Sequence, residues 1–246
     1  MRAITLLTDF GVADYFVGAM KGVILSINPH ATIVDITHEI PAQDVAAGAF
    51  TLLAAYDAFP KGTIHVAVVD PGVGSSRRPI VVSAADRFFV GPDNGIFTHV
   101  LDSASEVFHV TASEYFRQPI SNTFHGRDIF APVAAALSNG IDPSSLGPRI
   151  ADPIRLSISR NPQIIHIDHF GNLITNITRD SYKQGTTLVV NGNRIGAFRN
   201  FFGENAGEAG ELFAIWGSAG FLEIAVNGGS AAEILGVKRG DEVHFE

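Results

Sequence analysis

Cysteine is absent from this chain of 246 residues, which excludes disulfide bonds, thiolate metal ligands and a thiol nucleophile. Basic residues are few, because 17 Lys and Arg stand against 25 Asp and Glu, and the formal net charge is −8. Proteins that bind nucleic acid ordinarily present a basic surface, so this balance argues against a nucleic-acid partner. No segment approaches the ~20 apolar residues that cross a bilayer, so we expect no membrane partner.

The N-terminal residues run directly into a strand-like segment, with no basic region followed by an apolar stretch of the signal-peptide type. Together with the absence of cysteine, this pattern predicts a cytoplasmic location. Hydrophobic residues make up 46% of the chain, which is enough to build the core of one large domain or of two smaller ones.

The first half of the chain alternates between strand-like and helix-like segments. Apolar residues spaced by three and four predict a helix over 16–27, with Asp14 as a candidate N-cap. Asp44 is a candidate cap for a second helix that reaches Ala55. Further predicted elements are a helix over 128–137 and strands at 3–7, 32–36, 63–69, 80–83 and 88–90. This alternation predicts an α/β domain over residues 1–150, with a mainly parallel sheet and helices on both faces.

The pattern changes after about residue 148, where prolines mark a linker over 151–162. Beyond it the runs are typical of strands, at 164–167, 173–177, 187–190, 212–216, 221–226 and 242–245. Asn191-Gly192 is typical of a hairpin turn, and the only helical pattern is short, at 230–235. We therefore predict a second, smaller domain over 163–246, an antiparallel β-barrel.

The sequence VVDPGVGSSR at 68–77 carries a carboxylate, Asp70, from the end of a buried strand into a loop of glycines and serines. Ligands of open α/β sheets bind outside the carboxyl ends of strands, so this loop is a candidate site. It is not a dinucleotide fingerprint, because Arg77 stands where the third glycine belongs, and no Lys-Ser/Thr follows for a phosphate loop. A simple turn that ends the strand explains the same residues equally well.

Two other segments of the first half carry polar residues suited to a site. Asp9 and Asp14 follow the first strand, where carboxylates can accept hydrogen bonds from sugar hydroxyls or an ammonium. An Asx-type turn and a helix cap are the simpler explanations. His125 precedes the third predicted helix in the sequence TFHGRD, and His is the commonest general base. Arg127 and Asp128 are expected to form a local ion pair at the start of that helix.

The second half offers a loop that suits a planar ligand. The sequence DHFGN begins at Asp168, and its Asp-His pair lacks a third ligand at a zinc-like spacing, so we expect no metal. Phe170, followed by Gly and Asn172, suits stacking on a base and recognition of its edge, although a β-turn has the same composition. Small-residue loops at 216–221 and 226–230 let backbone groups approach a ligand, or are tight turns of a barrel.

Singly these segments are ambiguous, but their order along the whole chain resembles the S-adenosylmethionine hydroxide adenosyltransferase family. Members of that family are adenosine-forming hydrolases related to the fluorinase and the chlorinase. The matching segments are LTDFG at 7–11 with Asp14, IPAQDV at 40–45 with Gly48-Ala49, VDPGVG at 69–74 with Arg77, GPDNG at 91–95, TFHGRD at 123–128, DHFGN at 168–172 with Thr175-Asn176, and GFLEIAVN at 220–227.

The resemblance implies an N-terminal α/β domain, a C-terminal β-barrel and a homotrimer, with S-adenosylmethionine bound between the N-terminal domain of one subunit and the C-terminal domain of the next. It implies that Asp70, Arg77 and His125 act on water and that the substrate is the only small molecule required, without a cofactor. The other implied roles are Asp9 at the ribose hydroxyls, Asp14 and Asp168 at the methionine ammonium, Phe124 and Phe170 at the walls of the nucleoside, Asn172 and the backbone near Asn227 and Gly228 at adenine, and Ser218 near the methionine carboxylate.

Two departures from the fluorinase concern that carboxylate, because Ala219 replaces an arginine and Phe16 replaces a serine. The halogenases carry Tyr at the position of Asp70, so the resemblance favours hydrolysis. In hydrolysis a neutral thioether leaves C5′, and Arg77 stays protonated and holds the developing hydroxide. Either Asp70 or His125 takes the proton. The alternatives are halide alkylation, with His125-Gly126 as a halide pocket, and a non-catalytic module that binds adenosine or S-adenosylmethionine.

Overall fold

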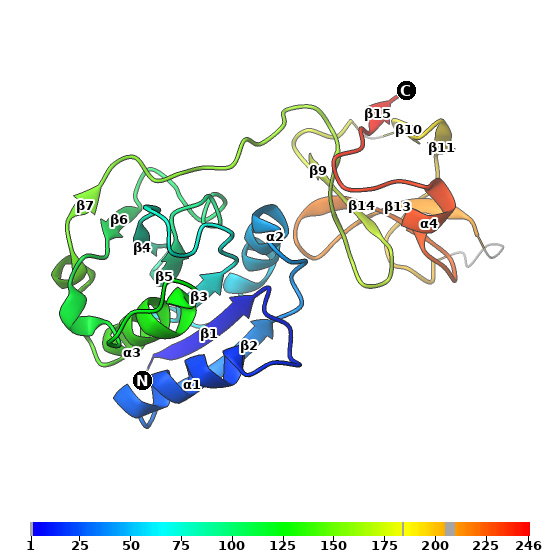
Figure 1. Ribbon diagram of the computed structural model, residues 1–246. Helices are drawn as coiled ribbons and strands as arrows, with labels where there is room; N and C mark the ends of the chain where they lie inside the picture. Colours follow the sequence, from blue (N-terminus) through cyan, green and yellow to red (C-terminus); the bar gives the residue numbers. More distant parts are fainter. Residues whose placement is uncertain (1, 184, 205–209) are drawn as a thin grey trace. The chain divides into compact units, whose positions relative to one another are not determined.

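The computed structural model describes residues 2–183, 185–204 and 210–246, which divide into two compact units, 1–156 and 157–246 (Figure 1). The boundary falls in the segment between β7 (Arg149–Ile150) and β8 (Ile164–Ile167), which contains no helix or further strand. Each unit has its own hydrophobic core and is described by itself below.

Unit 1 is built on a seven-stranded sheet with the order β2-β1-β3-β5-β4-β6-β7. Besides β7, the sheet contains β1 (Ala3–Thr8), β2 (Thr32–Thr37), β3 (Ile64–Val68), β4 (Pro79–Ala84), β5 (Arg87–Pro92) and β6 (Glu106–His109). The pairs β1–β2, β1–β3 and β3–β5 are parallel, whereas β4–β5, β4–β6 and β6–β7 are antiparallel. The prediction of a mainly parallel sheet is therefore wrong, and the sheet is mixed.

The antiparallel half of the sheet follows from a short connection. β4 and β5 are joined by Ala85 and Asp86 alone, with φ of 50° and 57°, the left-handed conformation of a two-residue hairpin turn. A parallel crossover needs a dozen or more residues, so this connection forces the two strands to run antiparallel.

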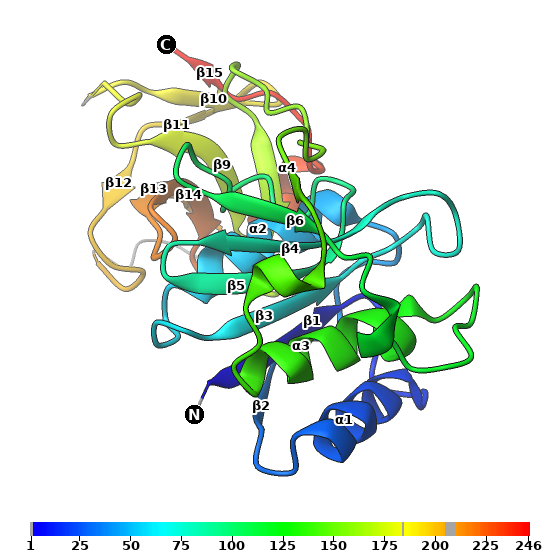
Figure 2. The same ribbon diagram turned by 90° about the vertical axis from the view of Figure 1, so that its left-hand side faces the viewer.

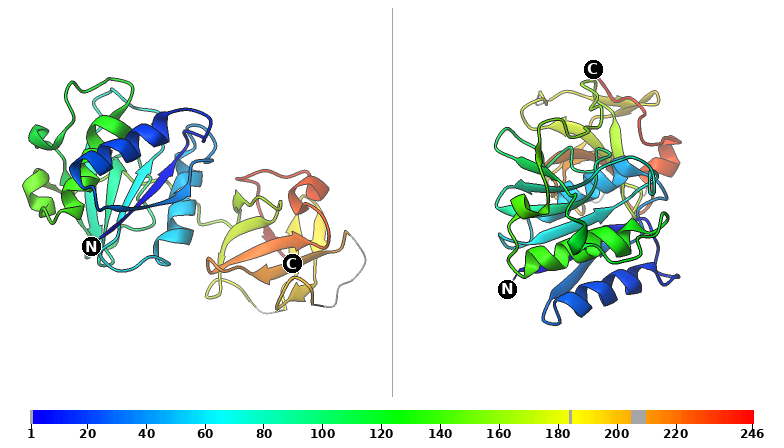
Figure 3. Two further views of the ribbon diagram at one scale, coloured as in Figure 1. Left: turned by 90° about the horizontal axis from the view of Figure 1, so that it is seen from below. Right: turned by 60° about the vertical axis from the view of Figure 1, so that its left-hand side comes forward.

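Helices cover both faces of the sheet, as predicted. α1 (Phe16–Ile27) and α3 (Ala131–Ser138) lie together on one face, and α2 (Val45–Tyr56) covers the other (Figure 2). Alternation along β1 sends Leu6 to the first core and Leu7 to the second. The pair of α1 and α3 is also visible on the right of Figure 3, and hydrogen bonds from Asn28 to Ser138 and from Asn139 to Ile27 join their C-terminal ends.

Helix ends follow the sequence in part. Asp44 caps α2, because its Oδ1 accepts the backbone N–H of Ala47 at 3.0 Å. Asp14 does not cap α1, whose N-cap is Tyr15, without a side-chain hydrogen bond. The predicted helix over 128–137 is α3 preceded by a π-helical turn, Gly126–Phe130. Two short 3₁₀ turns, Ser113–Tyr115 and Pro143–Leu146, complete unit 1.

The strand order of unit 1 creates a switch point. The chain leaves β1 through α1 to β2 on one side, then returns through α2 to β3 on the other side. Thr8 of β1 pairs with Val68 of β3, so Asp9 and Asp70 follow these strands at the same sheet edge. In open α/β sheets ligands bind at this position, outside the carboxyl ends of the strands where the order reverses.

Unit 2 contains a five-stranded sheet, β12-β13-β14-β9-β8, and a three-stranded sheet, β11-β10-β15 (Figure 3). The strands are β9 (Leu173–Thr178), β10 (Leu188–Val190), β11 (Asn193–Ile195), β12 (Phe198–Arg199), β13 (Leu212–Trp216), β14 (Phe221–Val226) and β15 (His244–Phe245), with one helix, α4 (Ala231–Leu235). All pairs are antiparallel except β12–β13.

The predicted β-barrel is wrong in its closure. Within the described residues the two sheets do not form one closed barrel, and their backbones meet at an isolated bridge between Gln163 and Glu242. Two local predictions are confirmed: Asn191 and Gly192, with φ of 47° and 76°, make the turn between β10 and β11, and the short helix predicted at 230–235 is α4. The structure adds that Ser230 caps this helix.

Candidate active site

The loop after β3 is held in place by its own backbone and by a neighbouring segment. Val73 donates to the carbonyl of Asp70 at 3.2 Å, and Ser75 donates to that of Gly72 at 3.1 Å. Gly74 has φ +78°, and a Cβ at this position would collide with the backbone carbonyl of Asn122. The loop is therefore a compact turn that requires glycine, and it brings Arg77 back to Asp70.

Arg77 and Asp70 form a bidentate ion pair. Arg77 Nε donates to Asp70 Oδ1 at 2.9 Å, and Nη2 donates to Oδ2. The side chains are only 9% and 4% exposed, so solvent screens the pair weakly. The guanidinium also lies over the ring of Phe130, 5.2 Å from its centroid. Arg77 is thus held by a carboxylate along one edge and by an aromatic ring over its face.

His125 completes the cluster. Its Nδ1 lies 2.7 Å from Arg77 Nη2, and because a guanidinium has donors only, Nδ1 accepts this hydrogen bond. The neutral ring therefore carries its proton on Nε2. Burial lowers the pKa of His125, and the positive charge of Arg77 lowers it further, against smaller opposing effects of Asp70 and Asp128. The imidazole is accordingly neutral near pH 7.

One donor of this cluster is left over. Arg77 Nη1 is buried and has no hydrogen-bond partner among the described residues. Buried polar groups are nearly always paired, so the unpaired Nη1 is an exception to the usual pattern. The sequence alone could not identify this atom, because its environment depends on residues 70, 125 and 130 folding around the guanidinium.

Asp9 lies beside the cluster at the end of β1, and its Oδ2 accepts the backbone N–H of Gln43 at 2.8 Å. Gln43 adopts φ 65°, so the chain bends sharply to aim that N–H at the carboxylate. Asp14 is exposed on the loop before α1. Both carboxylates retain lone pairs for further donors.

Aromatic rings line the same end of unit 1. Phe124 is 6% exposed and meets Phe16 edge-on, with ring centroids 5.1 Å apart, and Phe10 at 5.9 Å. Tyr15, 67% exposed, stands next to Phe16 at 4.6 Å. Phe124 is thus mostly covered by its own neighbours, and only a small part of its ring is open to a ligand.

In unit 2 the loop 168–172 is organised by Asp168. Its Oδ1 accepts the N–H of Phe170 and of Asn172, and its Oδ2 accepts Asn172 Nδ2, all between 2.8 and 2.9 Å. This fixes the amide of Asn172, which is 6% exposed, and leaves the ring of Phe170 73% exposed. Gly171, with φ +81°, packs so closely on Ser230 that no side chain fits.

The remaining predicted residues of unit 2 lie in the two turns around β14. Ser218 is exposed in the turn 217–220, where Gly217 donates to the carbonyl of Phe221. Asn227 is bound through its backbone to Glu211, and Gly228 follows with φ +75°. Both turns present backbone groups at the surface.

Sequence reasoning assigned no role to Glu223, which lies on β14 inside a matching segment. Burial raises the pKa of its carboxyl, and the negative charge of Asp168 raises it further. Its carboxylate fills the space at Gly217 where a side chain would otherwise lie. The signal was available in the sequence as an acidic residue in an apolar strand.

Two classes of feature are not found among the residues described. Within 2–183, 185–204 and 210–246, no three His, Asp or Glu side chains are grouped so that they could hold a metal ion. In that same part of the chain, every helix is too short or too polar to cross a bilayer.

Family models match both units of the chain. The model for the SAM hydroxide adenosyltransferase N-terminal domain covers residues 4–147, and that for the C-terminal domain covers residues 162–244. The chain belongs to the SAM hydroxide adenosyltransferase family. The resemblance inferred from the order of the short segments is therefore confirmed.

Relatives within this family of SAM hydroxide adenosyltransferases span the full chain. An (R)-S-adenosyl-L-methionine hydrolase of Thermus thermophilus is 39% identical over all of both chains. A fluorinase of Nocardia brasiliensis is 27% identical over 99% of this chain and 96% of its own. An uncharacterized conserved protein of Thermotoga maritima has a crystal structure that matches with a TM-score of 0.89, at 38% identity over 99% of this chain and all of its own.

The SAM hydroxide adenosyltransferase chain thus carries its predicted residues in two groups. Unit 1 brings together Asp70, Arg77 and His125 by direct hydrogen bonds, with Asp9 at the neighbouring strand end. Unit 2 holds Asn172 against Asp168 by a hydrogen bond, whereas its other predicted residues lie in separate turns. Within the described residues of unit 1, Asp14 forms no hydrogen bond with Asp70, Arg77, His125 or Asp9.

Proposed function

We propose that this protein hydrolyses S-adenosyl-L-methionine to adenosine and L-methionine, and that its substrate has the (R) configuration named for its relatives. A water oxygen forms a bond to C5′ as the C5′–S bond breaks and its electron pair passes to sulfur. Methionine leaves as a neutral thioether, so the leaving group needs no acid. One proton is released from the water, and the protein has to accept it.

The observation that carries this proposal is the buried cluster in which hydrogen bonds to Asp70 and His125 fix the guanidinium of Arg77. Hydroxide is an anion, and a guanidinium donor fixed by Asp70 and His125 stabilises it where it forms. The protonated Nε2 of His125 supplies a second donor to the water. Such a pair of donors orients the oxygen lone pair, and positioning of this kind accounts for a large part of enzymatic acceleration.

Asp70 is the base in this scheme. His125 uses the lone pair of Nδ1 to accept from Arg77 and carries a proton on Nε2, so neither nitrogen is free to take another. Each oxygen of Asp70 accepts one donor from Arg77 and keeps a second lone pair for the water. Of the two candidate bases that the sequence leaves open, we therefore propose Asp70, with His125 as the group that orients the water.

The substrate contacts follow from the resemblance and from the loops described above. Asp9 accepts the ribose hydroxyls through Oδ1, Asn172 reads the adenine edge with the backbone at Asn227 and Gly228, and Phe170 and the exposed part of Phe124 cover the nucleoside. Asp14, Asp168 and the neighbouring Glu223 meet the methionine ammonium, and Ser218 meets its carboxylate. We further propose a cytoplasmic homotrimer that requires no cofactor, in which unit 1 of one subunit and unit 2 of another share each site.

The test is a product analysis with the purified protein in ¹⁸O-labelled water, with the two sulfonium epimers supplied separately. We expect adenosine labelled at the 5′-oxygen, L-methionine, and faster turnover of the (R) epimer. Free adenine would mean glycosidic cleavage and would refute in-line attack. A 5′-chloronucleoside as the main product at high chloride would establish halide alkylation instead. Binding of adenosine without turnover of either epimer would mean that the protein is a non-catalytic binding module.

A further inference from the structure

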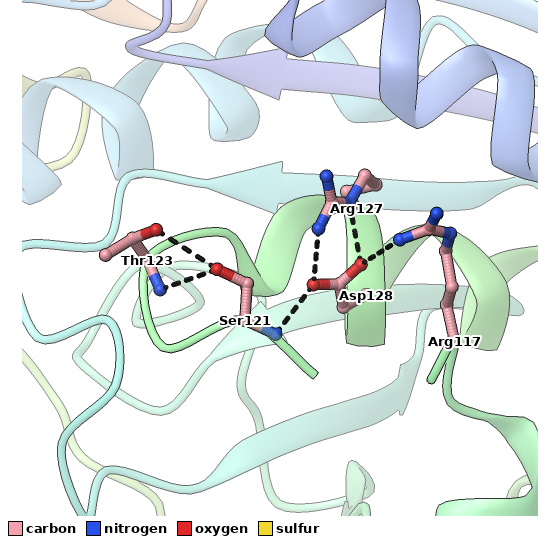
Figure 4. Close-up of polar contacts among 5 residues, drawn as sticks. All are labelled: Arg117, Ser121, Thr123, Arg127 and Asp128. Atoms are coloured by element: carbon pink, nitrogen blue, oxygen red, sulfur yellow. Dashed lines mark hydrogen bonds and ion pairs between the residues drawn. The ribbon is translucent and has the colours of Figure 1, made fainter. Parts of the chain in front are cut away.

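Asp128 is fully buried at the start of the π-helical turn that follows His125, and four N–H groups surround its carboxylate (Figure 4). Oδ1 accepts from Arg127 Nε at 2.7 Å and from Arg117 Nη1 at 3.2 Å. Oδ2 accepts from Arg127 Nη2 at 2.9 Å and from the backbone N–H of Ser121 at 2.9 Å. Burial alone would raise the pKa of Asp128, but these donors lower it, so the group is a carboxylate.

A first route connects this carboxylate to His125. Asp128 fixes the backbone of Ser121, and the Oγ of Ser121 accepts the N–H of Thr123 at 3.2 Å and lies 3.1 Å from Thr123 Oγ1. Thr123 stands two residues before His125. Asp128 also donates its own N–H to the carbonyl of Phe124, the residue directly before His125, at 3.2 Å. The backbone that leads into His125 is thus tied to Asp128 by two separate links.

A second route reaches the loop of Asp70 and Arg77. The backbone carbonyl of Asn122, next to Ser121, packs against Gly74 so closely that no Cβ fits there. Gly74 lies inside the turn that returns Arg77 to Asp70. Movement of the segment 117–123 would therefore displace this turn as well.

We propose that Asp128 is a positioning residue that holds His125 and the Asp70–Arg77 loop in register with each other. The expected effect on turnover rests on the proposed function. The placement of His125, in contrast, can be measured without any reaction. The positive charges of Arg117 and Arg127 stabilise the carboxylate of Asp128 inside the fold. The ion pair of Arg127 and Asp128 that the sequence predicts therefore has a buried carboxylate.

The test compares Asp128→Asn with the native protein. All four partners of Asp128 are N–H donors, two on each oxygen, so the amide of asparagine places its NH₂ group against two donors and loses both hydrogen bonds. A misplacement of about 1 Å can reduce turnover about 10²-fold, and we expect kcat to fall by roughly that factor while the Kd for adenosine stays unchanged. The control is Asp142→Asn, which removes a carboxylate of unit 1 that binds Ser144 instead.

The second readout is the NMR titration of His125 in the free protein, assigned by its loss in His125→Gln. The charged groups that act on His125 are Arg77, Asp70 and Asp128. Because the negative charge of Asp128 raises the pKa of His125, Asp128→Asn should shift the His125 ring signals and lower its midpoint, and Asp142→Asn should change neither. Loss of the charge alone would lower the midpoint without moving the His125 ring signals of the neutral form, so a lower melting temperature with unchanged kcat and unchanged ring signals would overturn the proposal.

Arg117 provides a variant that keeps the fold if Asp128→Asn does not, because its side chain is 46% exposed. Arg117→Met should lower kcat about tenfold, equivalent to about 1.4 kcal/mol, because it removes one of the two arginines that hold Asp128, and Arg117→Lys should restore part of it. Equal kcat in both variants and the native protein would contradict the proposal. If the native protein turns over neither epimer while Asp128→Asn still moves the His125 signals, the proposed function fails and the positioning role stands.

Discussion

At the scale of single residues, the hydrogen bonds of Arg77 and Asp70 predict that changes to these two residues affect kcat and not substrate binding. Asp70→Asn and Arg77→Met should each lower kcat by about 10²–10³ with little change in KM, because each removes a preorganised group from the transition state. His125→Gln should cost less, since His125 orients the water and does not take its proton. Steady-state kinetics check this, with Asp9→Ala as the contrast that raises KM.

The double variant of Asp70 and Arg77 tests whether the two act as one unit. Groups that act on the same water are non-additive, so the double variant should be little slower than the slower single variant. Additive losses in kcat would mean that the two side chains serve separate steps, and the bidentate pair would then be structural.

His65 gives a prediction about stability and pH. It lies buried in β3 with Nδ1 2.8 Å from Thr5 Oγ1, and burial together with the charge of Arg87 lowers its pKa to about 4. In the unfolded chain the pKa is about 6.5, so between these values the unfolded state binds more protons and stability falls as pH falls. From pH 7 to 4.5 the loss from this residue should be about 2 kcal/mol. Urea unfolding should show a pH dependence smaller by that amount in His65→Gln, and an unchanged dependence would refute the assignment.

At the scale of elements, the turn of residues 70–77 depends on one glycine. Gly74→Ala places a Cβ in a left-handed conformation and against the carbonyl of Asn122. Gly140 is a matched control, because it has φ +94° and open space around it, so that Gly140→Ala adds strain alone. We expect Gly140→Ala to cost about 1 kcal/mol and Gly74→Ala clearly more, with a loss of kcat only in the latter. Equal melting temperatures and turnover for the two variants would mean that Asn122 moves aside freely.

Most helices and strands could be located from the sequence, but the direction and pairing of the strands could not be predicted from it. Apolar periodicity predicted α1 and α2 to within a residue or two, because buried faces repeat with the helical period. Periodicity carries no strand direction, and the antiparallel turn at Ala85 and Asp86 showed only in the short spacing between two runs. The barrel was wrong for a related reason: closure depends on long-range pairing, which local patterns do not contain.

The candidate site divides in the same way. The polar residues after β1 and β3 could be predicted as neighbours, because parallel strands end at one edge of a sheet. The tautomer of His125 and the unpaired Nη1 of Arg77 could not, since both depend on distances between segments far apart in the chain. Asp128 was correctly expected to pair with Arg127, whereas its bonds to Ser121 and Arg117 became visible only in the fold.

At the scale of the whole molecule, the proposed sharing of each site by unit 1 of one subunit and unit 2 of another predicts complementation. Mixed subunits of Asp9→Ala and Asn172→Ala should regain activity, because unit 1 of the second chain and unit 2 of the first make a native site. The matched control mixes Asp9→Ala with Asp70→Asn, where every unit 1 is altered and no activity should return. Light scattering of the active species should give a trimer, and a fully active monomer would exclude the shared site.

The loop 168–172 has a thermodynamic consequence for ligand capture. Asp168 holds the loop by three hydrogen bonds, one of them to the side-chain amide of Asn172, so the conformational entropy of ordering this loop is lost during folding and not during binding. Calorimetry should therefore show that Asp168→Ala weakens adenosine binding mainly through a less favourable entropy, while the enthalpy of recognising the base changes little. The purine edge would then bind to a loop that is already ordered. A nucleoside that lacks the matching edge would bind more weakly, because the loop does not rearrange to accommodate it.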